Sequence, residues 1–263
     1  MAAQGALRYV ELSEARAARG VRMVGAWALP SPWTEAAKGI FHVKEISVLC
    51  VRHKRGDADQ HTWAGVQNVP AVFFDDEAPR TGWAEILLLA ERLGGRVSLI
   101  PADPAERARF FGLAHEVCGE DGLAWNARLI MLHGSMTSNG ARSFPMRIAS
   151  YLAASYGYAP DRIDRAHRRV REVLGLIDAT LAASRAAGQG YLLGDRLSAL
   201  DIYLATFITP IVGVTVEECP GMVDVVRPAF AYLGEQVGAE MPPALAEHRR
   251  KIYREHLPWP IVL

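Results

Sequence analysis

The sequence is poor in cysteine, with Cys50, Cys118 and Cys219 as the three cysteines among 263 residues. They are widely spaced and odd in number, and neither a Cys-x-x-Cys pair nor a Cys/His cluster accompanies them. Their scarcity argues against a disulfide framework and against a zinc site, so no metal is expected. Reduced thiols are typical of the cytoplasm, which is the expected location.

An excess of charge of either sign is also missing, because 29 basic residues balance 29 acidic ones. A net charge of zero gives no long-range attraction to nucleic acid or to an anionic membrane surface, so neither is expected as a partner. No secretory signal is expected either, since charged residues interrupt the apolar run near the N-terminus at Arg8, Glu11, Glu14 and Arg16.

Long apolar runs free of charge are absent as well. The longest candidate, residues 197–216, contains Asp201 and Pro210 and begins with residues typical of the start of a soluble helix. These features favour a buried core helix over a membrane span.

Half of the residues are hydrophobic and 22% are charged, which suits two modest globular domains in a chain of this length. Residues 1–20 are polar and alanine-rich and are expected to form a loose arm or a short helix. Residues 21–95 alternate between strand and helix patterns. We predict strands over 21–27, 46–51 and 69–76, a short strand at 80–81, and helices over 32–42 and 83–93.

After Pro101 and Pro104 the pattern is helical only, which predicts an all-helical domain over residues 104–263. Helices are expected over 106–118, 123–133 and 143–156, from 161, from 198, and once or twice within 221–263. A proline-containing tail after residue 256 is expected to pack back on the surface. Five arginines on the helix from 161 are interpreted as a solvated face that Asp161, Asp164 and Glu172 balance, namely Arg162, Arg165, Arg168, Arg169 and Arg171.

Ser198 and Asp201 form a capping box at the start of the apolar helix from 198. Replacement of such a cap costs roughly 0.5–2 kcal/mol. The run Gly-Asp-x-x-Ser-x-x-Asp-Ile over residues 194–202 resembles the folding motif of the cytosolic glutathione transferases.

Two further segments carry this resemblance, Ser31-Pro32-Trp33-Thr34 at a first helix and Val69-Pro70 before a strand. Together the three segments resemble the bacterial serine-type glutathione transferases, and the Ser-Pro-aromatic run is similar to that of the lignin β-etherases. The resemblance implies an α/β thioredoxin-like N-terminal domain over residues 21–95, an all-α C-terminal domain, glutathione as co-substrate, and a homodimer.

Ser31 would by this resemblance lie beside the glutathione sulfur. A hydroxyl donor and the N–H groups of a helix N-terminus stabilise a thiolate and lower its pKa. Ser31 can equally be a helix cap alone, and the two roles are compatible. A serine here instead of a cysteine argues against disulfide reduction.

The resemblance implies six further residues that contact glutathione, namely Trp33, Thr34, Val69, Pro70, Thr81 and Gly82. The resemblance implies a cis Val69–Pro70 bond whose preceding residue pairs with the glutathione backbone. Where the family carries Glu-Ser or Gln-Ser, this sequence has Gly82 and Trp83, so two polar anchors are missing. Glu85 offers either a contact to an ammonium group or an ordinary solvated side chain.

Phe110, His115, Trp125 and Met131 are candidates for a second-substrate pocket, and each can equally be a core residue. The predicted function is attack by the glutathione thiolate on a small apolar electrophile such as an aryl ether, epoxide or halide. The alternative is a binding or scaffold protein of the same fold with altered or lost glutathione binding.

Overall fold

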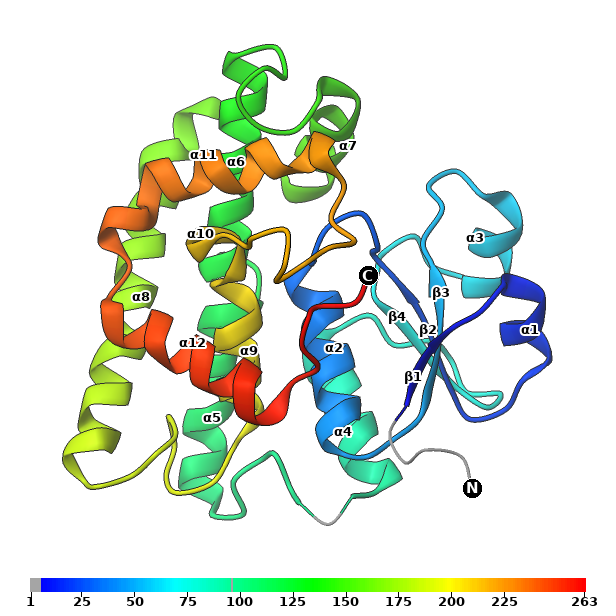
Figure 1. The fold of residues 1–263 in the computed structure, drawn as a ribbon, viewed down its shortest axis with the longest axis horizontal. Coiled ribbons are helices and arrows are strands. Elements are labelled where there is room, and N and C mark those ends of the chain that lie inside the picture. The colour runs from blue at the N-terminus through cyan, green and yellow to red at the C-terminus, as the bar shows by residue number, and fades with distance from the viewer. Residues whose placement is uncertain (1–5, 96) are drawn as a thin grey trace.

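The computed structural model describes residues 6–95 and 97–263, which form a small mixed sheet with flanking helices and a larger helical region (Figure 1). The four strands of the sheet are β1 (Leu7–Tyr9), β2 (Val21–Gly25), β3 (Val48–Arg52) and β4 (Ala71–Phe74). They lie in the order β1-β3-β2-β4. Strands β1 and β2 run parallel to β3, whereas β4 runs antiparallel to β2. Arg80 pairs with Val72 of β4 in an isolated bridge, at the predicted short strand.

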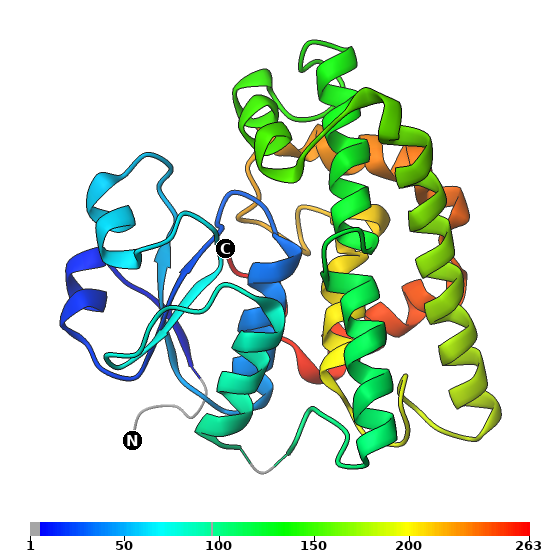
Figure 2. The same cartoon turned by 180° about the vertical axis from the view of Figure 1, so that it is seen from behind.

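Four helices accompany the sheet: α1 (Leu12–Ala17), α2 (Pro32–Val43), α3 (Ala58–Ala64) and α4 (Trp83–Leu93). Helices α2 and α4 pack together between the sheet and the helical region, as both views show (Figures 1 and 2). The predicted parallel strand-helix-strand unit is present as β2-α2-β3.

Two elements of this region go beyond the sequence prediction. Strand β1 lies in the segment expected to be a loose arm or a short helix, of which residues 1–5 are outside the described residues. Helix α3 lies in the polar stretch 53–68. Its ends carry ordinary signals, since the Asp57 carboxylate accepts the Gln60 N–H (2.9 Å) and Gly65 adopts a left-handed conformation (φ 64°).

The helical region follows the predicted pattern. Its helices are α5 (Pro104–Cys118), α6 (Leu123–Thr137), α7 (Met146–Tyr156), α8 (Ile163–Ala186), α9 (Ala199–Phe207), α10 (Thr209–Val212), α11 (Arg227–Val237) and α12 (Pro243–His256). The helix predicted from residue 198 is divided, because α9 ends at Phe207 and α10 begins two residues later. All nine residues of α9 are buried, and the helix packs against α2, α5 and α12. Within the described residues, every helix is too short or too polar to cross a membrane.

Asp201 supplies its half of the predicted capping box at the start of α9, whereas the Ser198 hydroxyl accepts no helix N–H within the described residues. Its Oδ2 accepts the Ser198 N–H (2.9 Å) and the Ser198 hydroxyl (2.7 Å). Its Oδ1 accepts the Leu192 N–H (2.9 Å) and lies 2.8 Å from His248 Nε2. Asp201 is fully buried, so this carboxylate joins three segments of the chain as well as capping a helix.

The tail over residues 257–263 packs back across α2, as expected (Figure 1). Leu257, Ile261 and Leu263 are buried, and the other four residues are exposed. The Val262 carbonyl accepts a hydrogen bond from Lys38 Nζ (2.6 Å). A Cβ atom at Gly39 would lie 2.8 Å from Leu257 Cδ2, so a larger residue here would require the Leu257 side chain to shift.

Candidate functional site

A cleft of about 650 Å³ separates the sheet region from the helical region. The sheet region lines it with the start of α2, the loops around β3 and β4, and the start of α4. The helical region contributes the end of α5 and parts of α6 and α7. Ser31-Pro32-Trp33-Thr34, Val69-Pro70 and Thr81-Gly82, which the sequence analysis singled out in the sheet region, each contribute residues to this cleft.

Ser31 is the N-cap residue of α2 and lines this cleft. Its carbonyl accepts the Glu35 N–H (2.8 Å), so the backbone begins the helix. Its hydroxyl makes no capping hydrogen bond, and none to any other group in the described part of the chain. The hydroxyl and the positive end of the α2 dipole are thus both available to an anion in the cleft.

Val69 and Pro70 line the cleft beside Ser31, and the peptide bond between them is cis, as predicted. Strand β4 begins only at Ala71, which pairs with Val24. Within residues 6–95 and 97–263, the Val69 N–H and carbonyl have no hydrogen-bond partner. An extended ligand can therefore pair with this backbone as an added strand.

Thr81, Gly82 and Trp83 line the cleft at the start of α4. Glu85 folds back over this start, and its Oε2 accepts the Gly82 N–H (3.1 Å), so it caps the helix and is not simply solvated. A Cβ atom at Gly82 would lie 2.9 Å from that oxygen. The Trp83 ring packs edge-on against Tyr203 of α9, with centroids 5.6 Å apart.

Trp33 and Thr34 have different surroundings. Trp33 lines the cleft, and its Nε1 donates to the Cys118 carbonyl (3.0 Å) across the two regions. Thr34 is fully buried, and its hydroxyl accepts the Ala26 N–H (3.2 Å) after β2. The structure therefore places Thr34 behind the cleft, where it holds the turn that precedes Ser31.

The four second-substrate candidates divide equally. His115 and Trp125 line the cleft, and the Trp125 ring lies 4.6 Å from that of Tyr156. Phe110 and Met131 are core residues outside the cleft lining, because the inward faces of α5 and α6 bury them against other helices. The same periodicity marks both kinds of position, so spacing alone does not separate them.

The cleft also contains residues that the sequence interpretation missed. His53, Arg55, Gln67 and Asn68 come from the loops after β3 and before β4. Burial lowers the pKa of His53, and the nearby His61 and Arg55 lower it further. A usable signal was present, because loops at the carboxyl ends of strands in such a sheet lie close to the start of α2.

Arg128, Tyr151 and Tyr156 line the cleft from the helical region. Arg128 is the one charged residue in the predicted helix over 123–133 apart from the terminal histidine, and such an isolated charge was the available signal. Cys118 lines the cleft too, but burial raises the pKa of its thiol well above the ordinary value. Burial therefore disfavours the thiolate form of this cysteine.

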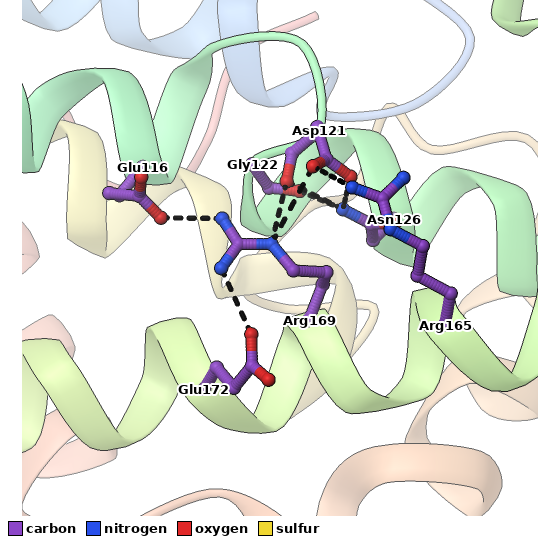
Figure 3. Close-up of polar contacts among 7 residues, drawn as sticks. All are labelled: Glu116, Asp121, Gly122, Asn126, Arg165, Arg169 and Glu172. Atoms are coloured by element: carbon purple, nitrogen blue, oxygen red, sulfur yellow. Dashed lines mark hydrogen bonds and ion pairs between the residues drawn. The ribbon is translucent and has the colours of Figure 1, made fainter.

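An ion-pair network holds the loop between α5 and α6 at the edge of the cleft (Figure 3). Arg169 of α8 donates to Glu116 (2.6 Å) and Glu172 (3.0 Å), and Arg165 pairs with Asp121. The Asn126 amide also donates to the Asp121 carbonyl (2.8 Å). This loop includes Gly119 and Glu120 of the cleft, so the network positions that wall.

Three of the five arginines, Arg165, Arg169 and Arg171, are ion-paired on a face that was expected to be solvated and charge-balanced, and their partners differ from the prediction. Glu172 is one of them, whereas Glu116, Asp121 and Glu240 take the places expected for Asp161 and Asp164. Three of these carboxylates come from other elements, which local sequence spacing does not reveal. No group of metal-ligating side chains occurs in the part of the chain that the structure describes.

Comparison with known proteins identifies the fold. Residues 160–236 match the family model for the C-terminal domain of glutathione S-transferases. A glutathione S-transferase domain-containing protein from Marinobacter aquaeolei VT8 aligns with 89% of this chain and 98% of its own, with 17% identity and a TM-score of 0.60. The β-etherase LigF from Sphingobium sp. strain SYK-6 aligns with 88% of this chain and 99% of its own, with 18% identity and a TM-score of 0.54.

The structure of Ure2p in complex with glutathione aligns with 88% of this chain and 93% of its own, with 13% identity and a TM-score of 0.50. A search of curated protein sequences gives no match. The chain thus has the fold of the glutathione S-transferase superfamily, with a thioredoxin-like sheet region and an all-helical region.

Proposed function

We propose that the protein is a glutathione transferase in which the thiolate of bound glutathione attacks an electrophilic carbon of a small, largely apolar substrate. Aryl ethers, epoxides and halides are the substrate classes. The observation that carries the proposal is the free hydroxyl of Ser31 at the N-terminus of α2, beside the unpaired backbone of Val69 in one cleft. The Ure2p complex supports it, because that protein has this fold and holds glutathione.

Glutathione would lie along the sheet region. The Val69 N–H and carbonyl would pair with its cysteinyl unit, which directs the sulfur toward Ser31. Its γ-glutamyl carboxylate would lie at the N-terminus of α4, where the first N–H groups lack partners within the helix. Thr81, Gln67 and Asn68 also line the cleft, and their hydroxyl and amide groups would take the place of the two missing polar anchors.

The reaction begins when the glutathione thiol loses its proton to solvent. The Ser31 hydroxyl then donates a hydrogen bond to the sulfur anion, and the helix dipole adds to its stabilisation. The sulfur electron pair forms the new C–S bond, and the leaving group departs with the electrons of the bond that breaks. In an epoxide the ring oxygen keeps those electrons and takes up a proton. His115 and Trp125 form the opposite wall, against which the electrophile packs.

Glutathione binding separates this proposal from its alternative, a binding or scaffold protein. Gly82 and Trp83 favour the alternative, because Glu85 already takes the Gly82 N–H and the Trp83 ring is packed against α9. We expect saturable heat in a calorimetric titration with millimolar glutathione. Absence of heat, together with no displacement of a bound dye, would contradict the transferase function. The alternative, a binding or scaffold protein of the same fold, would then stand.

Substitution of Ser31 tests the chemical step. A hydrogen bond to a charged group contributes about 1.5–3 kcal/mol, so Ser31→Ala should raise the pKa of the bound thiol by about 1–2 units and lower turnover about 10–100-fold. The thiolate absorbance of the complex across pH and the rate with chlorodinitrobenzene measure the two effects. Ser138→Ala is the matched control, because its hydroxyl bonds to the Gly134 carbonyl away from the cleft. Unchanged turnover in Ser31→Ala would refute the assigned role.

A homodimer and a cytoplasmic location belong to the same proposal. The three cysteines are free and buried, which agrees with reduced thiols. Light scattering of the purified protein tests the dimer, and a monomeric mass at micromolar concentration would contradict it.

A further inference from the structure

Arg128 of α6 is a buried guanidinium on the helical wall of the cleft. Only 8% of the residue is exposed, and that residue lines the cleft. Its guanidinium carbon lies 5.3 Å from the ring centroid of Phe144 and 5.8 Å from that of Tyr156. Two aromatic rings therefore hold the flat group, and the aromatic contacts leave its N–H edges available.

Arg128 has no protein acceptor of its own. Within residues 6–95 and 97–263, no carboxylate lies within 4.0 Å of its nitrogens, and none of its N–H groups makes a hydrogen bond. Arg169, by contrast, is paired with Glu116 and Glu172 although it is more exposed. The described buried nitrogens that lack a partner do not include those of Arg128, so its N–H edges retain accessible surface in the cleft. A residue that is only 8% exposed and still presents unpaired N–H edges to a cleft points to an anion that the chain does not supply.

The charges around Arg128 favour an anionic ligand. Arg55 lies on the sheet side of the cleft, with its guanidinium carbon 4.0 Å from the ring centroid of Tyr151. Glu120 is the one acidic residue among the described residues that line the cleft, and it is exposed. The cleft therefore has two guanidinium groups against a single solvated carboxylate, which favours an anion.

The position of Arg128 separates this ligand from glutathione. Ser31, Val69 and Thr81 belong to the sheet region, along which the tripeptide is proposed to lie. Arg128 comes from α6 of the helical region, and Trp125 precedes it by one turn on the same wall. The aromatic side chains of this wall suit a flat, apolar ring next to the anion.

We propose that Arg128 binds a carboxylate on the second substrate, so that the preferred electrophiles are aromatic acids with a leaving group or ether on the ring. The planar fork of the guanidinium matches both oxygens of a carboxylate. This inference rests on the proposed transferase function, because it names the substrate that the glutathione thiolate attacks.

The test compares two electrophiles that differ in one charge, chloronitrobenzoic acid and its methyl ester, at saturating glutathione. The wild-type protein should favour the acid in kcat/KM. Arg128→Met should lower kcat/KM for the acid about 10–100-fold, the fold-change of a lost hydrogen-bonded charge, and change that for the ester by less than about threefold. Arg128→Lys keeps the charge but lacks the planar guanidinium, and should give an intermediate ratio of kcat/KM for the acid to that for the ester.

Arg142→Met is the matched control, because that guanidinium also stacks on a tyrosine, Tyr232, but lies outside the cleft.

Three outcomes would overturn the inference while the transferase function stands. An unchanged acid-to-ester ratio in Arg128→Met is one, and a wild-type preference for the ester is another. Reduced glutathione affinity in Arg128→Met with no change in the ratio is the third, since it would assign the residue to glutathione.

A binding measurement keeps the inference testable if no turnover is seen. Benzoate and methyl benzoate can be titrated without glutathione, and the fluorescence of the tryptophans that line the cleft, Trp27, Trp33, Trp83 and Trp125, reports their binding. A preference for benzoate that Arg128→Met removes supports the site even if the transferase function fails. Equal affinity of the wild-type protein for both compounds overturns the inference. If Arg128→Met does not fold, Arg128→Lys and Arg128→Gln replace it in both measurements.

Discussion

Ser31 and Ser198 occupy the same position at the start of a helix, yet their surroundings differ completely. The Ser198 hydroxyl donates to a buried carboxylate, Asp201, at the start of α9. The Ser31 hydroxyl makes no capping bond and faces the cleft at the start of α2. Neither hydroxyl accepts an N–H group of its helix, but the Ser198 hydroxyl is used inside the fold, whereas the Ser31 hydroxyl has no partner in the described residues. The pair teaches that an N-cap serine whose hydroxyl has no partner is a better functional candidate than one whose hydroxyl is already bonded.

The largest effect on stability is expected for Asp201→Ala. This variant tests how much the contacts at the start of α9 stabilise the fold, compared with those at the start of α2. Four groups lose their acceptor, including His248, and removal of one partner of a buried pair costs about 3–5 kcal/mol. Urea denaturation gives this difference in the free energy of unfolding. Asp201→Asn keeps one acceptor oxygen and should lose less. A loss below about 2 kcal/mol in the free energy of unfolding would contradict the wider role and show that Asp201 stabilises the protein no more than an ordinary helix cap does.

Ser198→Ala should be next, with a loss of about 1–2 kcal/mol in the free energy of unfolding, because only one hydrogen bond to Asp201 disappears. Glutathione affinity should stay unchanged, because Ser198 lies outside the cleft lining. The same titration and denaturation experiments measure both quantities. A large drop in glutathione affinity at unchanged stability would break the division of roles between the two serines.

The pH dependence of stability involves one histidine at the cleft and one near the start of α9. Burial lowers the pKa of His53, at the cleft, and of His256, which hydrogen-bonds to Tyr191 before α9. Below the ordinary histidine pKa of about 6.5, the unfolded chain takes up protons that the native state excludes. The free energy of unfolding should therefore fall between about pH 7.5 and about pH 5.5, and His53→Gln should reduce that fall. An unchanged slope in this variant would contradict the assignment of His53.

The smallest effect is expected for the stability of Ser31→Ala, below about 0.5 kcal/mol, since no capping bond is lost. Its thermal unfolding should match the wild-type curve while turnover falls. A loss of stability as large as that of Ser198→Ala would show that Ser31 caps α2 in solution, and would break the comparison.

Local signals predicted most of the fold. Helix α4 spans the predicted residues, and α2 differs from prediction by a single residue. The same signals missed β1, because a three-residue edge strand has too little pattern to be recognised and depends on pairing with β3. Helix α3 was missed although both of its end signals stand in the sequence.

The candidate site could be predicted only in part. Ser31 and Val69 each belong to a short motif of neighbouring residues, and such a motif can be recognised from the sequence alone. Phe110 and His115 lie on the same helix, but only tertiary packing decides that one enters the core and the other the cleft. Arg128 was missed because its importance lies in the absence of a partner, and the absence of a contact has no local sequence signature.

The contact between Lys38 and Val262 joins residues separated by 224 positions. Tyr9 of the edge strand β1 also donates to the Val262 carbonyl, across 253 positions (3.3 Å). On a growing chain, the sheet region can therefore form its strands early but cannot complete its packing around α2 until residues 257–263 have left the ribosome. A region synthesised first is thus finished last, and α2, which carries Ser31 at its start, remains partly uncovered during synthesis.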